Sequence, residues 1–236
     1  MKVKDYFVRY SRQIFIDEIG LDGQRKIRDA KVLVIGAGGL GSPVIQYLAA
    51  AGVGVLGIAD FDRVEVHNLN RQVIHAENSV GHCKVNSASQ FVNALNSDVK
   101  VVGIEEKIGK SNVEEILSSY DIIVDCTDNF TSRYLINDHS VSLGKPLVYG
   151  SILGFSGQVA LFNYKGSKNL RDVFPNPPSE EDVPDCDRLG VLGSLPGIVG
   201  SMMAHHTLKL IIGLPVPLNQ LTLIDSLSWR FHTIEF

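Results

Sequence analysis

Continuous apolar runs that alternate with helix-forming segments are the main pattern in this chain. Residues 30–36 (AKVLVIG) form one such run, rich in β-branched side chains, which predicts a buried strand. A glycine-rich turn follows, and residues 43–52 (PVIQYLAAAG) have the composition of a helix with a proline in its first turn. This segment therefore predicts a strand, a tight turn and a helix in direct succession.

The same alternation repeats downstream. The predicted strands cover residues 53–60, 99–106, 121–126 and 146–152, and the predicted helices cover residues 84–95, 112–120 and 130–143. Strands that alternate with helices predict an α/β fold with a mainly parallel sheet and right-handed crossovers. Because the strands are continuously apolar, we expect helices to cover both faces of this twisted sheet.

The pattern changes in the last part of the chain. Residues 154–164 predict an exposed or antiparallel strand, whereas residues 165–190 are rich in proline, acidic and turn-forming residues and predict a long, mobile surface loop. The remaining predicted elements are a helix at 194–212 and a hairpin of two short strands at 220–226 and 229–236. We therefore expect antiparallel C-terminal strands to extend the same sheet, within a single domain over residues 1–236.

Composition narrows the class of protein. Hydrophobic residues make up 44% and charged residues 20% of the chain, which excludes a disordered or fibrous protein. A net charge of -4 gives no electrostatic footprint for binding nucleic acid. The first residues contain no apolar signal-peptide core. The apolar stretch 195–214 is interrupted by Ser201, His205, His206 and Lys209, so we expect a soluble protein with no membrane span.

Cysteine usage favours a reducing compartment. The chain contains Cys83, Cys126 and Cys186, an odd number of thiols that lie far apart in the sequence. This spacing excludes a disulfide framework and a C-x-x-C metal site. We therefore expect a cytoplasmic protein.

The glycine-rich turn predicts a nucleotide site. Gly36, Gly38 and Gly41 satisfy G-x-G-x-x-G between a predicted strand and a predicted helix, where backbone amides and the helix dipole favour a phosphate. Asp60 ends the next predicted strand and is placed to accept hydrogen bonds from ribose hydroxyls. At this point NAD, FAD and ATP all remain open.

The segment after Asp60 favours a triphosphate. Polar residues cluster there at Asp62, Asn68, Asn70 and Arg71, and Lys84 follows in GHCKV. A dinucleotide needs no additional cations beside its two phosphates, whereas a triphosphate carries more charge and benefits from Arg and Lys side chains. Either cation alone would be an ordinary surface charge. Together they indicate ATP.

Carboxylates at the same sheet edge predict a magnesium site. Asp125 lies at the end of the predicted strand at 121–126, and Asp128 and Asn129 follow it, so all three are expected to emerge at its carboxyl end. Mg²⁺ in nucleotide sites takes one or two protein carboxylates together with phosphate oxygens. The alternative is that Asp128 or Asn129 caps the helix that begins near Phe130, and the two roles are compatible.

Five linked motifs carry a family resemblance. The segments RYSRQ, GAGGLGS, DFDRVEVHNLNRQ, GHCKV and DCTDN, in this order and spacing, resemble the E1-like ATP-dependent adenylyltransferases typified by MoeB and ThiF. The resemblance covers nearly the whole chain and implies a Rossmann-like fold. It implies adenylation of the C-terminal glycine of a ubiquitin-like sulfur carrier protein ending in Gly-Gly, of the ThiS or the MoaD type. Residues 30–150 would then bind the nucleotide, and residues 151–236 would bind the carrier.

The resemblance also implies roles for individual residues. The residues at the nucleotide and its phosphates would be Gly39, Asp60, His67, Asn68, Leu69, Asn70, Arg71 and Lys84, with Asp128 and Asn129 beside the phosphates and Mg²⁺. Arg12 of RYSRQ matches the family's arginine finger, which reaches the site of a neighbouring subunit and implies a homodimer.

The reaction explains why no catalytic histidine stands out. A carboxylate is ionised at neutral pH, so its attack on the α-phosphate of ATP needs alignment and charge neutralisation rather than a general base. We interpret the scattered histidines as packing or surface residues. They are His67, His75, His82, His139, His205, His206 and His232.

Two features depart from many relatives. The chain lacks the two C-x-x-C pairs that hold a structural zinc in many of them, so we predict no zinc site. Cys186 matches the position of a loop cysteine that forms a sulfur-linked intermediate in other relatives, a role that would involve a sulfurtransferase or cysteine desulfurase as a further partner. Asp185 and Asp187 disfavour its thiolate, and an incidental exposed thiol is the equal alternative.

Three functional hypotheses follow. The first is carrier adenylation, with a ThiS-type carrier favoured because the RDVFP segment resembles some bacterial ThiF-like proteins, and a MoaD-type carrier as the alternative. An NAD-dependent oxidoreductase would share the glycine loop but would leave Arg71, Lys84 and Asp128 without a role. The third is a non-catalytic module that binds a ubiquitin-like protein, and the intact Arg12, Arg71, Lys84 and Asp128 argue against it.

Overall fold

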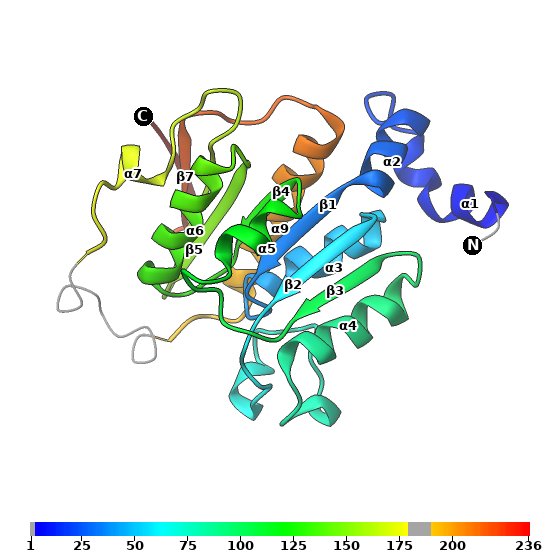
Figure 1. Ribbon diagram of the computed structural model, residues 1–236, viewed down its shortest axis with the longest axis horizontal. Helices are drawn as coiled ribbons and strands as arrows, with labels where there is room; N and C mark the ends of the chain where they lie inside the picture. Colours follow the sequence, from blue (N-terminus) through cyan, green and yellow to red (C-terminus); the bar gives the residue numbers. More distant parts are fainter. Residues whose placement is uncertain (1–2, 179–189) are drawn as a thin grey trace.

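A single eight-stranded sheet organises the protein. The computed structural model describes residues 3–178 and 190–236, and Figure 1 shows helices packed on both sides of the sheet. The strand order is β3-β2-β1-β4-β5-β6-β7-β8. The strands are β1 (Lys31–Ile35), β2 (Val55–Ala59), β3 (Lys100–Ile104), β4 (Ile122–Asp125), β5 (Leu147–Leu153), β6 (Ser156–Phe162), β7 (Gln220–Asp225) and β8 (Arg230–Glu235).

The helices follow the predicted crossovers, with two additions near the N-terminus. They are α1 (Val3–Ile14), α2 (Gly20–Asp29), α3 (Gly41–Ala51), α4 (Lys84–Leu95), α5 (Val113–Ser118), α6 (Phe130–Ser142), α7 (Leu170–Val173) and α9 (Ser194–Ile212). Two 3-10 turns, η1 (Val66–Asn68) and η2 (Glu77–Ser79), lie in the long connection between β2 and α4.

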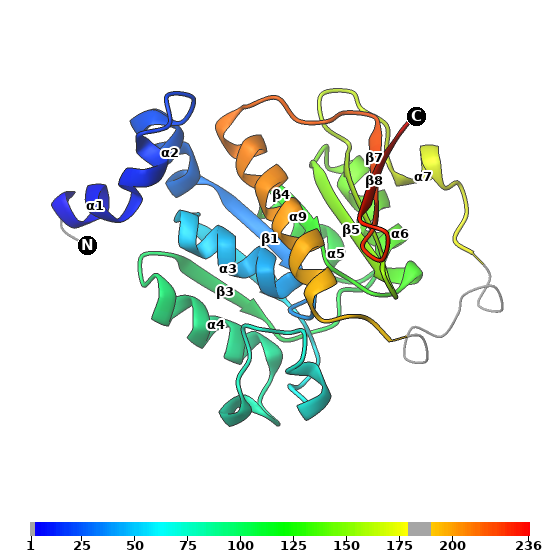
Figure 2. The ribbon, with the colours of Figure 1, turned by 180° about the vertical axis from the view of Figure 1, so that it is seen from behind.

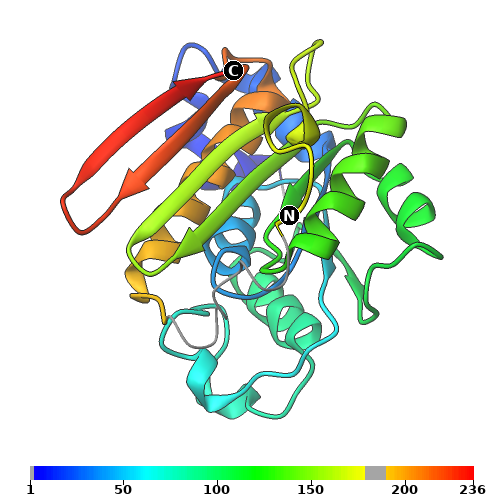
Figure 3. The ribbon, with the colours of Figure 1, turned by 90° about the vertical axis from the view of Figure 1, so that its left-hand side faces the viewer.

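Strand direction confirms the predicted fold class. β3, β2, β1, β4 and β5 are parallel, whereas β6, β7 and β8 join by antiparallel pairing. Figure 3 shows the β7–β8 hairpin at the edge of the sheet. The protein is therefore a Rossmann-like α/β sheet extended by antiparallel C-terminal strands.

Both faces of the sheet are buried, as the continuous apolar runs predicted. In β1, Val32 and Val34 belong to one apolar core, whereas Leu33 and Ile35 belong to the other. The first core contains the apolar residues of α3, α4 and α9, and the second contains those of α5 and α6. Figure 2 shows α3, α4 and α9 together on one face of the sheet. Burial on both sides fixes the carboxyl ends of the strands, where the loops of the site begin.

The N-terminal helices α1 and α2 were not predicted. They lie beyond the ends at which β1 and β2 begin (Figure 1), and they bury only a few residues, among them Tyr10 and Ile27. Gln24 is fully buried and donates from Nε2 to the Ala51 carbonyl at 3.0 Å. Both helices nevertheless have a clear amphipathic pattern, since Tyr10 and Ile14 are buried four residues apart in α1 and Gln24 and Ile27 three residues apart in α2, so this spacing was a usable signal.

The prediction of a mobile loop over residues 165–190 is wrong for its first part. Leu170 is buried at the start of α7, and Arg171 forms a 2.6 Å ion pair with Asp138 of α6. The Tyr134 hydroxyl donates to the Phe174 carbonyl at 2.9 Å. These contacts fasten the segment to α6. Residues 179–189 lie outside the described part of the chain.

No helix among the described residues is both long enough and apolar enough to cross a bilayer.

Candidate functional site

The glycine loop lies where the strand order reverses. β1 pairs with β2 on one side and with β4 on the other, the arrangement that opens a crevice at the carboxyl ends of parallel strands. Gly36 has a φ of +100°, and a Cβ placed there would lie 2.7 Å from the Cys126 carbonyl oxygen. A Cβ on Gly41 would lie 1.9 Å from the Gly36 carbonyl oxygen. Only glycine fits at both positions, so the loop brings its backbone close to the crevice.

A cavity of about 660 Å³ occupies this crevice and brings most of the predicted residues together. Among the predicted residues, those that line it are Gly36, Gly38, Gly39, Asp60, Asp62, His67, Asn70, Arg71, Lys84, Asp128 and Asn129. These residues come from loops far apart in the sequence that meet at one edge of the sheet. A cavity of this size accommodates a small-molecule ligand.

Asp60 shapes the loop as well as lining the cavity. Its Oδ2 accepts a hydrogen bond from the Ala37 amide at 2.8 Å, and its Oδ1 accepts one from the Asp62 amide at 2.9 Å. Each carboxylate oxygen has a second lone pair. The predicted contact with ribose hydroxyls therefore remains available to Asp60 and stays a prediction.

The two predicted cations lie at the same cavity but are held differently. Lys84 is the first residue of α4, and its Nζ lies 2.8 Å from Asp62 Oδ2 with only 8% of the side chain exposed. Arg71 donates from Nη1 to the His67 carbonyl at 3.0 Å and to Asn70 Oδ1 at 3.1 Å. Arg71 therefore keeps other donors for an anion, whereas Lys84 shares its charge with Asp62.

The carboxylates after β4 have separate environments. Asn129 caps α6 by accepting a hydrogen bond from the Ser132 amide at 2.9 Å, so the predicted cap is confirmed for Asn129. Asp128 is exposed and accepts only a 3.3 Å hydrogen bond from Asn129 Nδ2. Asp125 was expected to emerge at this edge but is fully buried, its Oδ2 has no partner, and burial raises its pKa.

The described residues do not form a metal site by themselves. No group of three His, Cys, Asp or Glu side chains among them is arranged to hold an ion. Asp128 nevertheless offers an exposed carboxylate inside the cavity, which suits Mg²⁺ that also binds phosphate oxygens. The predicted absence of zinc stays a prediction.

Besides Asp125, four of the predicted residues that the structure describes do not line the cavity. Gly41 allows the start of α3 to pack closely against the glycine loop. Leu69 is half-buried and directly follows η1. Asn68 Oδ1 accepts from the Glu65 amide at 3.0 Å, which makes it a support for η1. Arg12 is exposed in the last turn of α1, a helix that lies beyond the end at which β1 begins (Figure 1), whereas the glycine loop follows the other end of β1.

The sequence reasoning missed several residues at the site, among them Gln72, Arg133 and His75. Gln72 lines the cavity at 4% exposure, and its Oε1 has no partner. Arg133 is buried in α6, lines the cavity and donates from Nη1 to the Gly150 carbonyl at 2.8 Å. His75 is buried as expected, but its ring also bonds the glycine loop. Of these residues, only Gln72 could have been found from the sequence, because it directly follows the predicted site residue Arg71.

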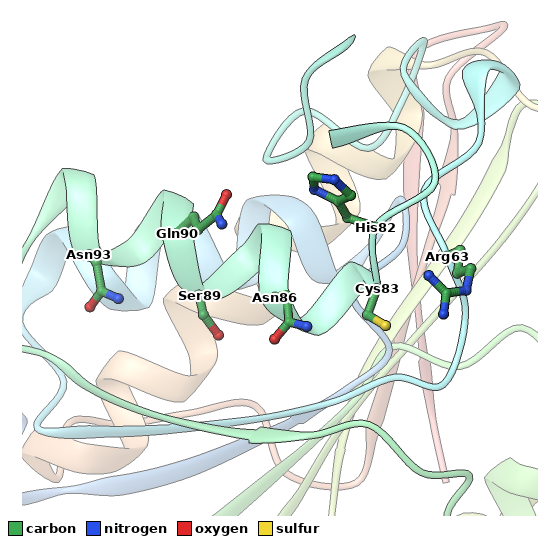
Figure 4. Close-up of a pocket in the computed structure, with 7 residues that line it drawn as sticks. All are labelled: Arg63, His82, Cys83, Asn86, Ser89, Gln90 and Asn93. Carbon is green, nitrogen blue, oxygen red and sulfur yellow. The ribbon is translucent and has the colours of Figure 1, made fainter. Parts of the chain in front are cut away.

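The cysteines occupy three different situations. Cys126 is buried, and burial raises the pKa of its thiol well above the ordinary value. Cys83 is half-buried in a second pocket of about 470 Å³ along α4, which shares no lining residue with the larger cavity (Figure 4). Cys186 lies outside the described residues. Of the described thiols, only Cys126 lines the candidate site.

Comparisons by sequence identify related proteins. A model of the ThiF family matches residues 10–236. A Thermus thermophilus protein named sulfur carrier protein adenylyltransferase is 45% identical over 237 residues, covering 98% of this chain and 88% of that protein. An Arabidopsis thaliana protein named adenylyltransferase and sulfurtransferase MOCS3 is 47% identical over 232 residues, covering 98% of this chain. The chain spans about half the length of the MOCS3 relatives that it matches.

Solved structures share the fold. PaaA superposes with a TM-score of 0.83 at 22% identity, covering 98% of this chain and 73% of that one. E. coli MccB in complex with AMPCPP and MccA superposes with a TM-score of 0.84 at 23% identity, covering 96% of this chain and 70% of that one. At these identities the likeness concerns the fold alone.

Proposed function

We propose that this chain, which belongs to the ThiF family, is an ATP-dependent adenylyltransferase that activates the C-terminal glycine of a ubiquitin-like sulfur carrier protein. The observation that carries the proposal is the cavity that combines a glycine loop with Arg71, Lys84 and Asp128. The relative from Thermus thermophilus, 45% identical and matched over 88% of its length, bears the name of this activity.

The proposed reaction is a displacement at phosphorus. The carrier carboxylate attacks the α-phosphate of ATP, the bond between the α-phosphate and the bridging oxygen breaks, and pyrophosphate leaves with that electron pair. No proton needs to be removed, because the attacking carboxylate is already ionised at neutral pH. The protein must therefore align two anions and reduce their repulsion.

The residues around the cavity suit this task. Arg71 presents its guanidinium from the segment after η1, and Lys84 presents its ammonium from the start of α4. Asp128 would hold Mg²⁺, which would supply positive charge to the phosphate oxygens when bound. Lys84 is nearly buried, so solvent screens its charge less than that of a surface lysine, although Asp62 offsets part of that charge.

The carrier is proposed to be of the ThiS type. Support comes from the RDVFP segment, which resembles some bacterial ThiF-like proteins. It begins within α7 and is fastened to α6 by the ion pair between Arg171 and Asp138. A MoaD-type carrier is the alternative. The two hypotheses predict the same chemistry at the cavity and differ only in the protein that supplies the carboxylate.

A homodimer is proposed as the working assembly. Arg12 is exposed in the last turn of α1, which lies beyond the end of β1 opposite the glycine loop (Figure 1), and this supports a role at the site of a second subunit. Phe7, Val8 and Phe15 are exposed on or next to the same helix, and such an apolar surface favours association. We also propose a cytoplasmic location and a sulfur donor that acts with Cys186.

ATP–pyrophosphate exchange tests the proposed function. The protein is incubated with ATP, Mg²⁺ and labelled pyrophosphate, first alone and then with ThiS-type or MoaD-type carriers that end in Gly-Gly. Exchange that depends on one carrier supports the reaction and identifies the carrier. ATP binding without exchange on either carrier would favour a non-catalytic module that binds a ubiquitin-like protein.

A further inference from the structure

The buried imidazole of His75 connects the glycine loop to the helix that carries Lys84. Nε2 of His75 lies 2.9 Å from the Ala37 carbonyl oxygen, and Nδ1 lies 2.8 Å from Ser87 Oγ. Ala37 stands between Gly36 and Gly38 in the glycine loop, and Ser87 lies three residues after Lys84 on α4. Both contacts are shielded from water, since His75 is 7% and Ser87 is 5% exposed.

The partners of the ring determine its tautomer. A backbone carbonyl only accepts hydrogen bonds, so Nε2 must carry the hydrogen that bonds Ala37. Nδ1 of the neutral ring then accepts a hydrogen bond from the Ser87 hydroxyl. Burial lowers the pKa of His75, which keeps the ring neutral near pH 7. The imidazole therefore has one orientation and one protonation state in this position.

Both backbone polar groups of Ala37, the amide and the carbonyl, form hydrogen bonds with side chains. Its amide donates to Asp60 Oδ2 at 2.8 Å, while its carbonyl accepts from His75. The backbone on either side of Ala37 contains glycines, which have more conformational freedom than other residues. The two hydrogen bonds of Ala37 therefore restrict the backbone conformation of this part of the loop, which its glycines would otherwise leave free.

We propose that His75 is a positioning residue that fixes the glycine loop and α4 relative to each other. The loop amides and Lys84 can then bind the same phosphate groups. This inference rests on the proposed function, because it assigns the residue to binding of ATP. His75 itself does not line the cavity, so it acts through Ala37 and α4. Loss of the bond to Ala37 would weaken ATP binding more than it weakens the fold.

Two amide substitutions separate the contacts of the ring. The amide nitrogen of glutamine falls near the position of Nε2, whereas that of asparagine falls near the position of Nδ1. His75→Gln therefore keeps a donor for the Ala37 carbonyl, and His75→Asn does not reach it. Both variants lose the aromatic ring and so share most of the packing defect. Asparagine is one methylene shorter than glutamine, and the difference in Tm between the variants measures the effect of that methylene.

The test compares ATP affinity with thermal stability. Calorimetric titration with ATP and Mg²⁺, without any carrier, measures Kd, and ATP–pyrophosphate exchange with a carrier measures KM for ATP. We expect His75→Asn to raise both by about tenfold, the effect of one lost hydrogen bond, and His75→Gln to stay within about threefold. Equal affinities in two variants of similar Tm would overturn the proposal.

If a variant does not fold, a measurement on the unmodified protein still tests the proposal. Nitrogen-labelled histidine distinguishes the two tautomers by NMR. We expect the Nε2–H form for His75, and the Nδ1–H form would refute the proposal. If the unmodified protein binds ATP but shows no exchange with either carrier, the proposed function fails, while the calorimetric comparison of the variants still tests His75.

Discussion

Replacement of Gly41 by alanine tests whether the close approach of α3 and the glycine loop is needed for activity. The added Cβ would lie 1.9 Å from the Gly36 carbonyl oxygen and 2.9 Å from its carbon. A carbon and an oxygen atom normally stay about 3.3 Å apart. Because the obstructing atoms belong to the backbone, no side-chain rotation relieves the clash. Either the loop or the start of α3 must move by more than about 1 Å.

The displacement predicts two separate effects. Overpacking of this kind costs about 1–3 kcal/mol in the free energy of unfolding, which for a domain of this size lowers Tm by about 2–12 °C. A displacement of about 1 Å in groups that align substrates costs about 100-fold in rate. We therefore expect kcat/KM for ATP in the exchange reaction to fall about 100-fold while the protein still folds.

Gly197→Ala is the matched control. Gly197 lies within α9, and a Cβ built there meets no atom within 4 Å. Alanine is also the better helix former by about 0.5–1 kcal/mol, so this variant should keep full exchange activity and an equal or higher Tm. If Gly41→Ala exchanged pyrophosphate as fast as Gly197→Ala, the assigned tight contact at the loop would be refuted.

Further predictions concern the charged residues, the loop cysteine and pH. Arg71→Ala and Asp128→Ala should each abolish carrier-dependent exchange with Tm nearly unchanged, and a variant with nearly full activity would remove that residue from the proposed machinery. Cys186→Ser should leave exchange intact and impair only transfer of sulfur to the carrier; loss of exchange would contradict this assignment. Burial lowers the pKa of His206 to about 4, below the value of about 6.5 in an unfolded chain. The unfolded state therefore binds a proton more readily, and the stability from neutral His206 is complete above about pH 6.5 and is lost as pH falls toward 4. Denaturant titrations should show that His206→Gln reduces the loss of unfolding free energy between pH 7.5 and 5 by about 1–2 kcal/mol; the same pH dependence in both proteins would exclude His206 as its source.

Much of the fold was predictable because strands that are buried on both faces have continuously apolar sequences. The predicted helices at 84–95 and 194–212 match α4 and α9, and the predicted C-terminal hairpin matches β7 and β8. Both faces of β1 are buried, so every residue of that strand but Lys31 carries the signal. By contrast, α1 and α2 were missed although both are amphipathic, because they bury few residues and precede the alternating strands and helices from which the other elements were predicted.

The candidate site was predictable where motifs follow strand ends. The positions after β1, β2 and β4 converge at one cavity because parallel strands place their carboxyl ends at one sheet edge. His75 was not recognised as a contact of the loop, because its partner is the Ala37 carbonyl and a backbone partner leaves no mark in the sequence. Arg133 was missed for the same reason, since it bonds the Gly150 carbonyl.

The central claim is that this protein transfers an adenylyl group from ATP to a carrier carboxylate. Intact-mass spectrometry of a ThiS-type or MoaD-type carrier, incubated with the protein, ATP and Mg²⁺, tests it directly. We predict that the carrier gains the mass of one adenylyl group (AMP less one water), that hydroxylamine removes this group, and that the Asp128→Ala protein does not add it. A carrier that keeps its original mass with the unmodified protein, under conditions in which ATP is bound, would contradict the account.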